Sequence, residues 1–144
     1  MSLKIKGMDK LLKKLARLEK GGARRAMRKA TVAGTTVLRT AVRAAVPVDE
    51  GLLKKATSSR VSGKGNRMTG RVGADVAKLK SANASDSSRP TNIDHLVEFG
   101  HVGPDGSFVP PSGYMRQSSA AAMPAAEAKY VSKLAEEIER EAMK

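Results

Sequence analysis

The feature that most constrains the fold is a long segment, residues 23–46, in which apolar side chains recur at helical spacing. Most of them are small, so a sheet or another helix can approach closely. Thr31, Val32 and Gly34 lower the helix propensity in the middle, so packing has to hold this helix together. Pro47 follows, and the residue before a proline disfavours the helical conformation. We therefore predict a helix over residues 23–46, with an apolar stripe of Ala23, Ala26, Met27, Ala30, Ala33, Val37, Leu38, Ala41, Val42 and Ala45.

Two shorter elements are predicted before this helix. Residues 3–7 alternate apolar and basic side chains and end at a glycine, as a short edge strand would. Asp9 can cap a helix that we expect to end at Gly21–Gly22. The apolar side of that helix would be formed by Leu11, Leu12, Leu15 and Leu18.

A turn and a hairpin are predicted after the long helix. Asp49 can cap a short turn starting at Glu50, Gly51 permits a tight approach, and Leu52 and Leu53 anchor the turn on the core. Residues 58–62 and 68–72 then read as two strands around a glycine-rich loop, residues 63–66. Residues 79–92 form a polar loop, most polar over residues 81–91, that we expect to be mobile until a partner orders it.

The C-terminal third holds one further strand and one further helix. The apolar run Leu96, Val97 and Phe99, ended by Gly100, fits a buried strand or a single helical turn, and we favour the strand. Residues 109–116 contain two prolines and a glycine, which disfavour regular secondary structure. This segment should lead into the next helix. Helical spacing resumes over residues 118–143, and Pro124 predicts either a helix that starts near it or a kink. The apolar side of this helix would be Ala121, Ala125, Ala128, Val131, Leu134, Ala135, Ile138 and Ala142.

These elements predict a single α+β domain over residues 1–144. A small antiparallel sheet would pack against the long helix, joined by a C-terminal helix and a mobile polar loop. Apolar residues make up 40% of the chain, but much of this is alanine and aromatics make up only 3%. Such a thin core favours an oligomer, in which contacts between subunits add burial. The chain has no cysteine and no apolar stretch long enough to cross a membrane, so we expect a cytoplasmic site of synthesis.

Charge divides the chain in two. Residues 1–80 carry 21 basic and 5 acidic side chains, whereas residues 81–144 carry 6 and 9, and the whole has a net charge of +13. Such an excess favours DNA, RNA or an acidic protein surface as a partner. The basic half lacks Phe, Tyr and Trp, which a stacking nucleic-acid reader would need, so only non-specific phosphate contact is expected.

No catalytic, cofactor or metal site is predicted. Asp94, His95, Glu98 and His101 are candidate metal ligands. On a helix His95 and Glu98 would share a face, but on the strand that we favour the side chains would diverge. The Gly63-Lys64-Gly65 string lacks the first glycine of a phosphate-binding loop and the Ser or Thr after the lysine. No Ser, His and acid arrangement can be singled out, and no cysteine nucleophile exists. A hydrolase or metalloenzyme is therefore the least favoured class.

Four motifs occur in order along the chain: Lys4–Leu15, Ala45–Lys55, Leu96–Gly100 and Pro110–Arg116. With them the chain resembles the neck or tail-completion proteins of long-tailed bacteriophages. It departs from the pattern at Glu50, where the family usually has Thr, and at residues 113–117, where a proline after the arginine is missing. The residues that carry the resemblance are Pro47, Asp49, Gly51, Leu52, Val97, Glu98, Phe99, Gly100, Pro110, Tyr114 and Arg116.

The resemblance implies a non-enzymatic subunit of a six-fold or twelve-fold ring around the DNA path. This ring would contact head-closure or connector proteins and the tail terminator or tail tube, with no cofactor and no membrane. The protein would lie in the virion neck or tail, and in the host cytoplasm during assembly. We expect one helical face to meet a neighbouring ring or DNA, with the residues Arg24, Arg25, Arg28, Arg39 and Arg43. The alternative is a basic, non-specific nucleic-acid-binding protein unrelated to virions.

Overall fold

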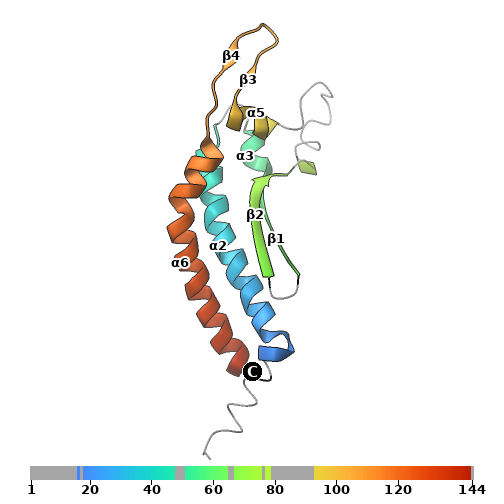
Figure 1. The fold of residues 1–144 in the computed structure, drawn as a ribbon, viewed down its shortest axis with the longest axis vertical. Helices are drawn as coiled ribbons and strands as arrows, with labels where there is room; N and C mark the ends of the chain where they lie inside the picture. Colours follow the sequence, from blue (N-terminus) through green and yellow to red (C-terminus); the bar gives the residue numbers. More distant parts are fainter. Residues whose placement is uncertain are drawn as a thin grey trace, which may run out of the picture.

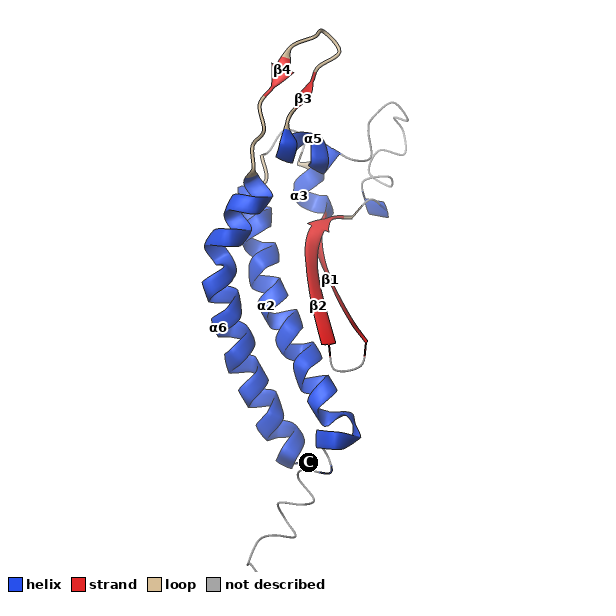
Figure 2. Ribbon diagram, in the orientation of Figure 1, coloured by secondary structure: helices blue, strands red, loops and turns tan. Residues whose placement is uncertain are grey.

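The computed structural model describes residues 16, 18–47, 51–64, 67–75, 77–78 and 93–143. Two long helices lie side by side along the molecule, and a two-stranded hairpin lies along the other side of the first helix (Figure 1). A second, smaller hairpin projects from one end (Figure 2). The elements are η1 (Leu18–Gly22), α2 (Ala23–Ala45), α3 (Leu52–Ala56), β1 (Thr57–Lys64), β2 (Arg67–Ala74), α5 (Ile93–Phe99), β3 (His101–Val102), β4 (Phe108–Val109) and α6 (Tyr114–Met143). The predicted α+β class, with a sheet on a long helix and a C-terminal helix, is confirmed.

The helix predicted over residues 23–46 is α2, and it ends where Pro47 requires. Val46 leaves the helical region with ψ 124° while its N–H still donates to Val42 O at 3.1 Å. Gly21, at φ 95°, lies outside the helical region, and the π-helical turn η1 ends at Gly22, directly before α2. An element therefore ends at the predicted stop, Gly21–Gly22, although no loop separates it from α2.

α2 is the central layer, because α6 packs on one side of it and β1–β2 on another. Gly34 faces α6, where an added Cβ would lie 3.0 Å from Ala126 O. On the sheet side, a Cβ on Gly70 would overlap Thr35 Oγ1. Gly34 and Thr35 are both buried although neither belongs to the predicted apolar stripe. A one-face pattern could not reveal them, since a helix packed on two sides buries two faces.

The hairpin β1–β2 is confirmed and longer than predicted. Its antiparallel register runs from Thr57 opposite Ala74 to Lys64 opposite Arg67. Val72 and Ala74 pack against the core cluster formed by Val42, Val46, Leu53 and Tyr114. Half of the buried apolar residues in the described part of the chain are alanines, so the apolar area buried per residue is small, as the composition predicted.

The strand favoured around residues 96–99 is wrong, because Ile93–Phe99 forms helix α5. A short apolar run does not distinguish a strand from a helical turn, and here Gly100, at φ 75°, ends the helix. The helical path turns Phe99 outward, so this side chain is 64% exposed and does not anchor the core.

α6 begins at Tyr114, earlier than predicted, and runs through Pro124 without a break in its helical assignment. A start near Pro124 is therefore wrong. The predicted inward face is also wrong: of that stripe, Ala121, Ala125, Ala128, Val131, Ala135 and Ile138 are exposed. Ala126, Glu137 and Glu141 are buried instead. Salt bridges to α2, described below, hold the helix in this rotation.

The projecting hairpin β3–β4 was not predicted. His101 lies opposite Val109 and Val102 opposite Phe108. Gly103 N donates to Ser107 O at 2.7 Å, and Gly106 has φ 82°. The Pro104-Asp105-Gly106 string is a turn signal that could have revealed this hairpin. The predictions for residues 3–7, the helix from Asp9 to Leu15, Asp49, Glu50 and the loop 79–92 lie outside the described residues.

Candidate partner-binding surfaces

Several motif residues build the junction between α5 and α6. The Glu98 carboxylate accepts hydrogen bonds from Met115 N at 2.9 Å and Arg116 N at 3.1 Å. It therefore caps the first turn of α6, where unpaired N–H groups and the helix dipole favour an anion. The connecting chain is fixed too, since Ser112 Oγ and Ser112 N both donate to Val97 O.

Gly100 and Tyr114 complete this junction. A Cβ on Gly100 would lie 2.6 Å from Val109 O, so a larger residue would clash as well as be strained by the positive φ. Tyr114 is buried in the core cluster. Burial, and after it the negative charges of Asp94 and Glu98, raises the pKa of the Tyr114 phenol to about 12. These two residues act in folding.

The other described motif residues are spread over the surface. Gly51 has φ 73° with no described atom within 4 Å of an added Cβ, so the turn requires its conformation and no tight approach is involved. Leu52 and Val97 are half-buried, and Pro47, Pro110 and Arg116 are exposed. The motif residues therefore identify positions that determine the fold, and they do not converge on one binding site.

The β3–β4 hairpin and the end of α5 expose large apolar side chains. Phe99 and Phe108 are 64% and 69% exposed, and Val102 and Val109 are also exposed. We call these four residues the apolar arm, and Figure 1 shows the hairpin part of it projecting beyond the helix pair. The ring of His95 packs at 4.9 Å, centroid to centroid, against that of Phe99. Exposed apolar residues gathered on a projection are typical of a contact surface between proteins.

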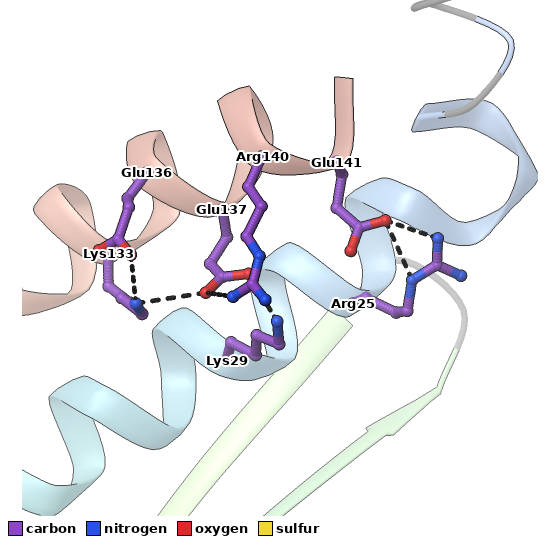
Figure 3. Close-up of polar contacts among 7 residues, drawn as sticks. All are labelled: Arg25, Lys29, Lys133, Glu136, Glu137, Arg140 and Glu141. Carbon is purple, nitrogen blue, oxygen red and sulfur yellow. Dashed lines mark hydrogen bonds and ion pairs between the residues drawn. The ribbon is translucent and has the colours of Figure 1, made fainter. Parts of the chain in front are cut away.

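Two glutamates of α6 are buried against α2 (Figure 3). Glu137, 1% exposed, accepts a hydrogen bond from Lys29 and also pairs with Lys133 and Arg140. Hydrogen bonding from Lys29 is the main reason that the pKa of the Glu137 carboxyl is lowered. Glu141, 2% exposed, accepts from Arg25 at 2.6 Å. This helix interface is therefore held by charge as well as by packing.

The opposite side of α6 is apolar and uncovered. Ala120, Pro124, Ala128, Val131, Ala135 and Ile138 are all exposed, Val131 to 63%. We call them the α6 outer face. Their intervals of three and four residues place them in one stripe along the helix. Such a stripe is typical of a seam that receives another helix.

The five arginines singled out in the sequence do not form one surface. Arg24, Arg25 and Arg28 line a groove of about 340 Å³ with the end of the hairpin, and Arg24 donates to Gly63 O at 3.3 Å. Arg25 also forms an ion pair with Glu141 of the same chain. Arg39 and Arg43 lie about 16 Å and about 22 Å beyond Arg28 along α2, given 1.5 Å per residue. Neither makes an ion pair with the described part of the chain.

Sequence reasoning missed a second basic surface, on the hairpin β1–β2. Arg60 lies directly opposite Arg71, and Lys64 lies directly opposite Arg67. All four are exposed. The signal was available, since basic residues four apart on each strand must lie on one side of a sheet. We call these four residues the basic hairpin face.

The candidate metal ligands are not assembled. Within the residues that the structure describes, no group of three or more His, Cys, Asp or Glu side chains is placed to hold a metal ion. Glu98 is used by the α6 cap, His95 is exposed, and His101 Nδ1 is buried without a hydrogen-bond partner. Among the described helices, none combines the length and apolarity that crossing a membrane requires.

Comparison with known proteins relates the chain to a protein family. A family model described as "Bacteriophage HK97-gp10, putative tail-component" matches residues 9–100, which include α2, the hairpin β1–β2 and α5. Neither the curated proteins nor the solved structures contain a match.

Proposed function

The chain belongs to the HK97-gp10-like family of bacteriophage tail components, and from this premise we propose that it is a ring-forming structural subunit of the head-to-tail interface. In this proposal, identical subunits surround the DNA path and join the head connector to the tail terminator or tail tube. The family places the protein among structural components of the virion. Copy number, six or twelve, and the order of neighbours belong to the proposal.

The observation that carries the proposal is the reversed polarity of α6. Its apolar outer face is exposed while Glu137 and Glu141 are buried against α2. A subunit that worked alone would gain by turning apolar residues inward and charges outward. The arrangement is favourable when a partner covers the outer face, because each buried apolar side chain then adds to the stability of the assembly.

The occupant of this face is a second copy of the chain. The α6 outer face is flanked by the exposed carboxylates Glu127 and Glu139. The free side of α2 carries Arg28, Arg39 and Arg43 around the exposed Val32, at spacings that keep all four on one side of the helix. When α6 of one copy docks on α2 of the next, the acidic residues beside the α6 outer face therefore meet the arginines of α2. The apolar residues of the two surfaces meet each other. Such a head-to-tail contact uses two different surfaces, and repeating it forms a ring when the rotation between copies closes.

The test is the mass of the purified protein by light scattering, together with rescue of head-to-tail joining in a phage that lacks this gene. We expect wild type to form rings and rescue joining. Val131→Glu with Ile138→Glu should stay folded by circular dichroism, remain monomeric and fail to rescue. Ser132→Glu adds a charge beside the outer face and should behave as wild type. A doubly substituted protein that still forms rings and joins particles would contradict the proposal.

A further inference from the structure

The basic hairpin face has an arrangement that a folded protein does not favour by itself. Arg60 faces Arg71 and Lys64 faces Arg67 across the two strands. Like charges directly opposite in an antiparallel pair destabilise the sheet. No described carboxylate forms an ion pair or hydrogen bond with any of the four side chains. Asp75 lies at the edge of the same surface, but its carboxylate accepts from Ala77 N. An anion from outside would relieve this repulsion.

The shape of this face fits an extended anion better than a small one. Two open depressions, of about 370 Å³ and about 630 Å³, lie along the strands and share Arg71. Neither encloses a ligand. Arg60 and Lys64 are four residues apart, which is about 13 Å along a strand. The four cations therefore form an open row, as a polymer of regularly spaced negative charges requires.

The residues between the cations restrict the class of ligand further. They are small and neutral: Ser58 and Ser62 on β1, and Thr69 and Gly73 on β2. Hydroxyl groups donate hydrogen bonds to phosphate oxygens. No large apolar side chain lies among them, so the apolar centre typical of a protein interface is missing from this face. No aromatic side chain is present on either strand to stack on unpaired bases.

From these observations we propose that the basic hairpin face binds the phosphate backbone of double-stranded DNA without reading its sequence. The cations supply long-range attraction and release counterions from the duplex, and the hydroxyl groups fix the contact. The inference rests on the hairpin alone and does not require the ring.

The test is the binding of a fluorescent duplex of arbitrary sequence to the full chain, measured by anisotropy at several salt concentrations. Four phosphate contacts predict a slope of about −3.6 for log K against log salt. Arg60→Gln with Arg71→Gln should reduce the magnitude of that slope by about 1.8 and weaken binding several-fold at low salt. The control, Lys54→Gln with Lys55→Gln, removes the same charge from exposed positions of α3 and should leave the slope nearly unchanged.

Two results would overturn the proposal. One is an equal loss of affinity in both double variants, which would mean that net charge alone attracts DNA. The other is binding of polyglutamate by the hairpin, lost in the Arg60/Arg71 variant, without binding of duplex DNA, which would identify an acidic protein as the partner. The mass of the protein in solution, which tests the ring, is measured separately from DNA binding. A negative result for DNA binding therefore leaves the proposal of a ring intact.

Discussion

The Nζ atom of Lys29 lies 2.7 Å from the Oε2 atom of Glu137, and this contact joins the two long helices near the C-terminal end of α6. Lys29 is on α2 and Glu137 on α6, 108 residues apart in the chain. The glutamate is buried while the lysine is partly exposed, so the carboxylate depends on its partners far more than the ammonium does. This pairing fits the rotation of α6 in which its apolar outer face is exposed.

Acid should loosen the pair of helices. Hydrogen bonding from Lys29 lowers the pKa of the Glu137 carboxyl below its ordinary value of 4.5. A lowered pKa in the folded state contributes stability above pH 4.5, and this contribution is lost as the pH falls through the folded value. We expect the melting temperature of wild type to drop in this range, measured by circular dichroism from pH 7 to pH 2.

The variant Glu137→Gln isolates this effect. It should melt a few degrees below wild type at pH 7, because the amide loses the charge-assisted hydrogen bonds. The difference should close only as the pH falls through the lowered pKa of the Glu137 carboxyl. Glu136→Gln is the control, since Glu136 is exposed and, among the described residues, pairs with Lys133. A difference between wild type and Glu137→Gln that stays constant with pH would show that the charge is not what stabilises the helix pair.

Alkali should act through Tyr114. Its pKa is raised to about 12 by burial and by Asp94 and Glu98. A raised phenol pKa contributes stability below the unfolded value of about 10 and loses it as the pH rises towards 12. Tyr114→Phe keeps the ring in the core and should lack this part of the decline. Denaturant melts of both proteins between pH 9 and pH 12 measure it, and parallel curves would refute it.

Removing the α6 cap should cost stability. Glu98→Ala leaves Met115 N and Arg116 N without their acceptor, and we expect a loss of about 1–2 kcal/mol in the free energy of unfolding. Glu98→Gln keeps one acceptor oxygen and should lose less. Urea unfolding provides the measurement. If both variants are as stable as wild type, the cap does not contribute.

The contact between α2 and the hairpin should be sensitive to one methyl group. Gly70→Ala places a Cβ where Thr35 Oγ1 lies, so the strand must move away from the helix. We expect a loss of about 1–3 kcal/mol in the free energy of unfolding. Thr35→Ala removes the hydroxyl, and the double variant should recover most of the loss. Purely additive effects of the two substitutions would mean that the two residues do not compete for space.

Some of this fold was readable because local rules decide it. The bounds of α2 follow from periodic apolar residues and Pro47, and the hairpin β1–β2 follows from two short strands around glycines. The Pro104-Asp105-Gly106 turn was equally readable, and was overlooked. The Glu98 position was identified by resemblance, but its role as a cap depends on a helix 17 residues later.

The sequence by itself determined the long helix, the hairpin, the class of the fold and, through its motifs, the family. Only the tertiary structure decided which side of α6 is inside and that Phe99 points outward. The physical reason is that periodicity records which residues are apolar but not what each face meets. The buried carboxylates of Glu137 and Glu141 pair with cations on α2, and in this rotation the apolar side of α6 faces outward.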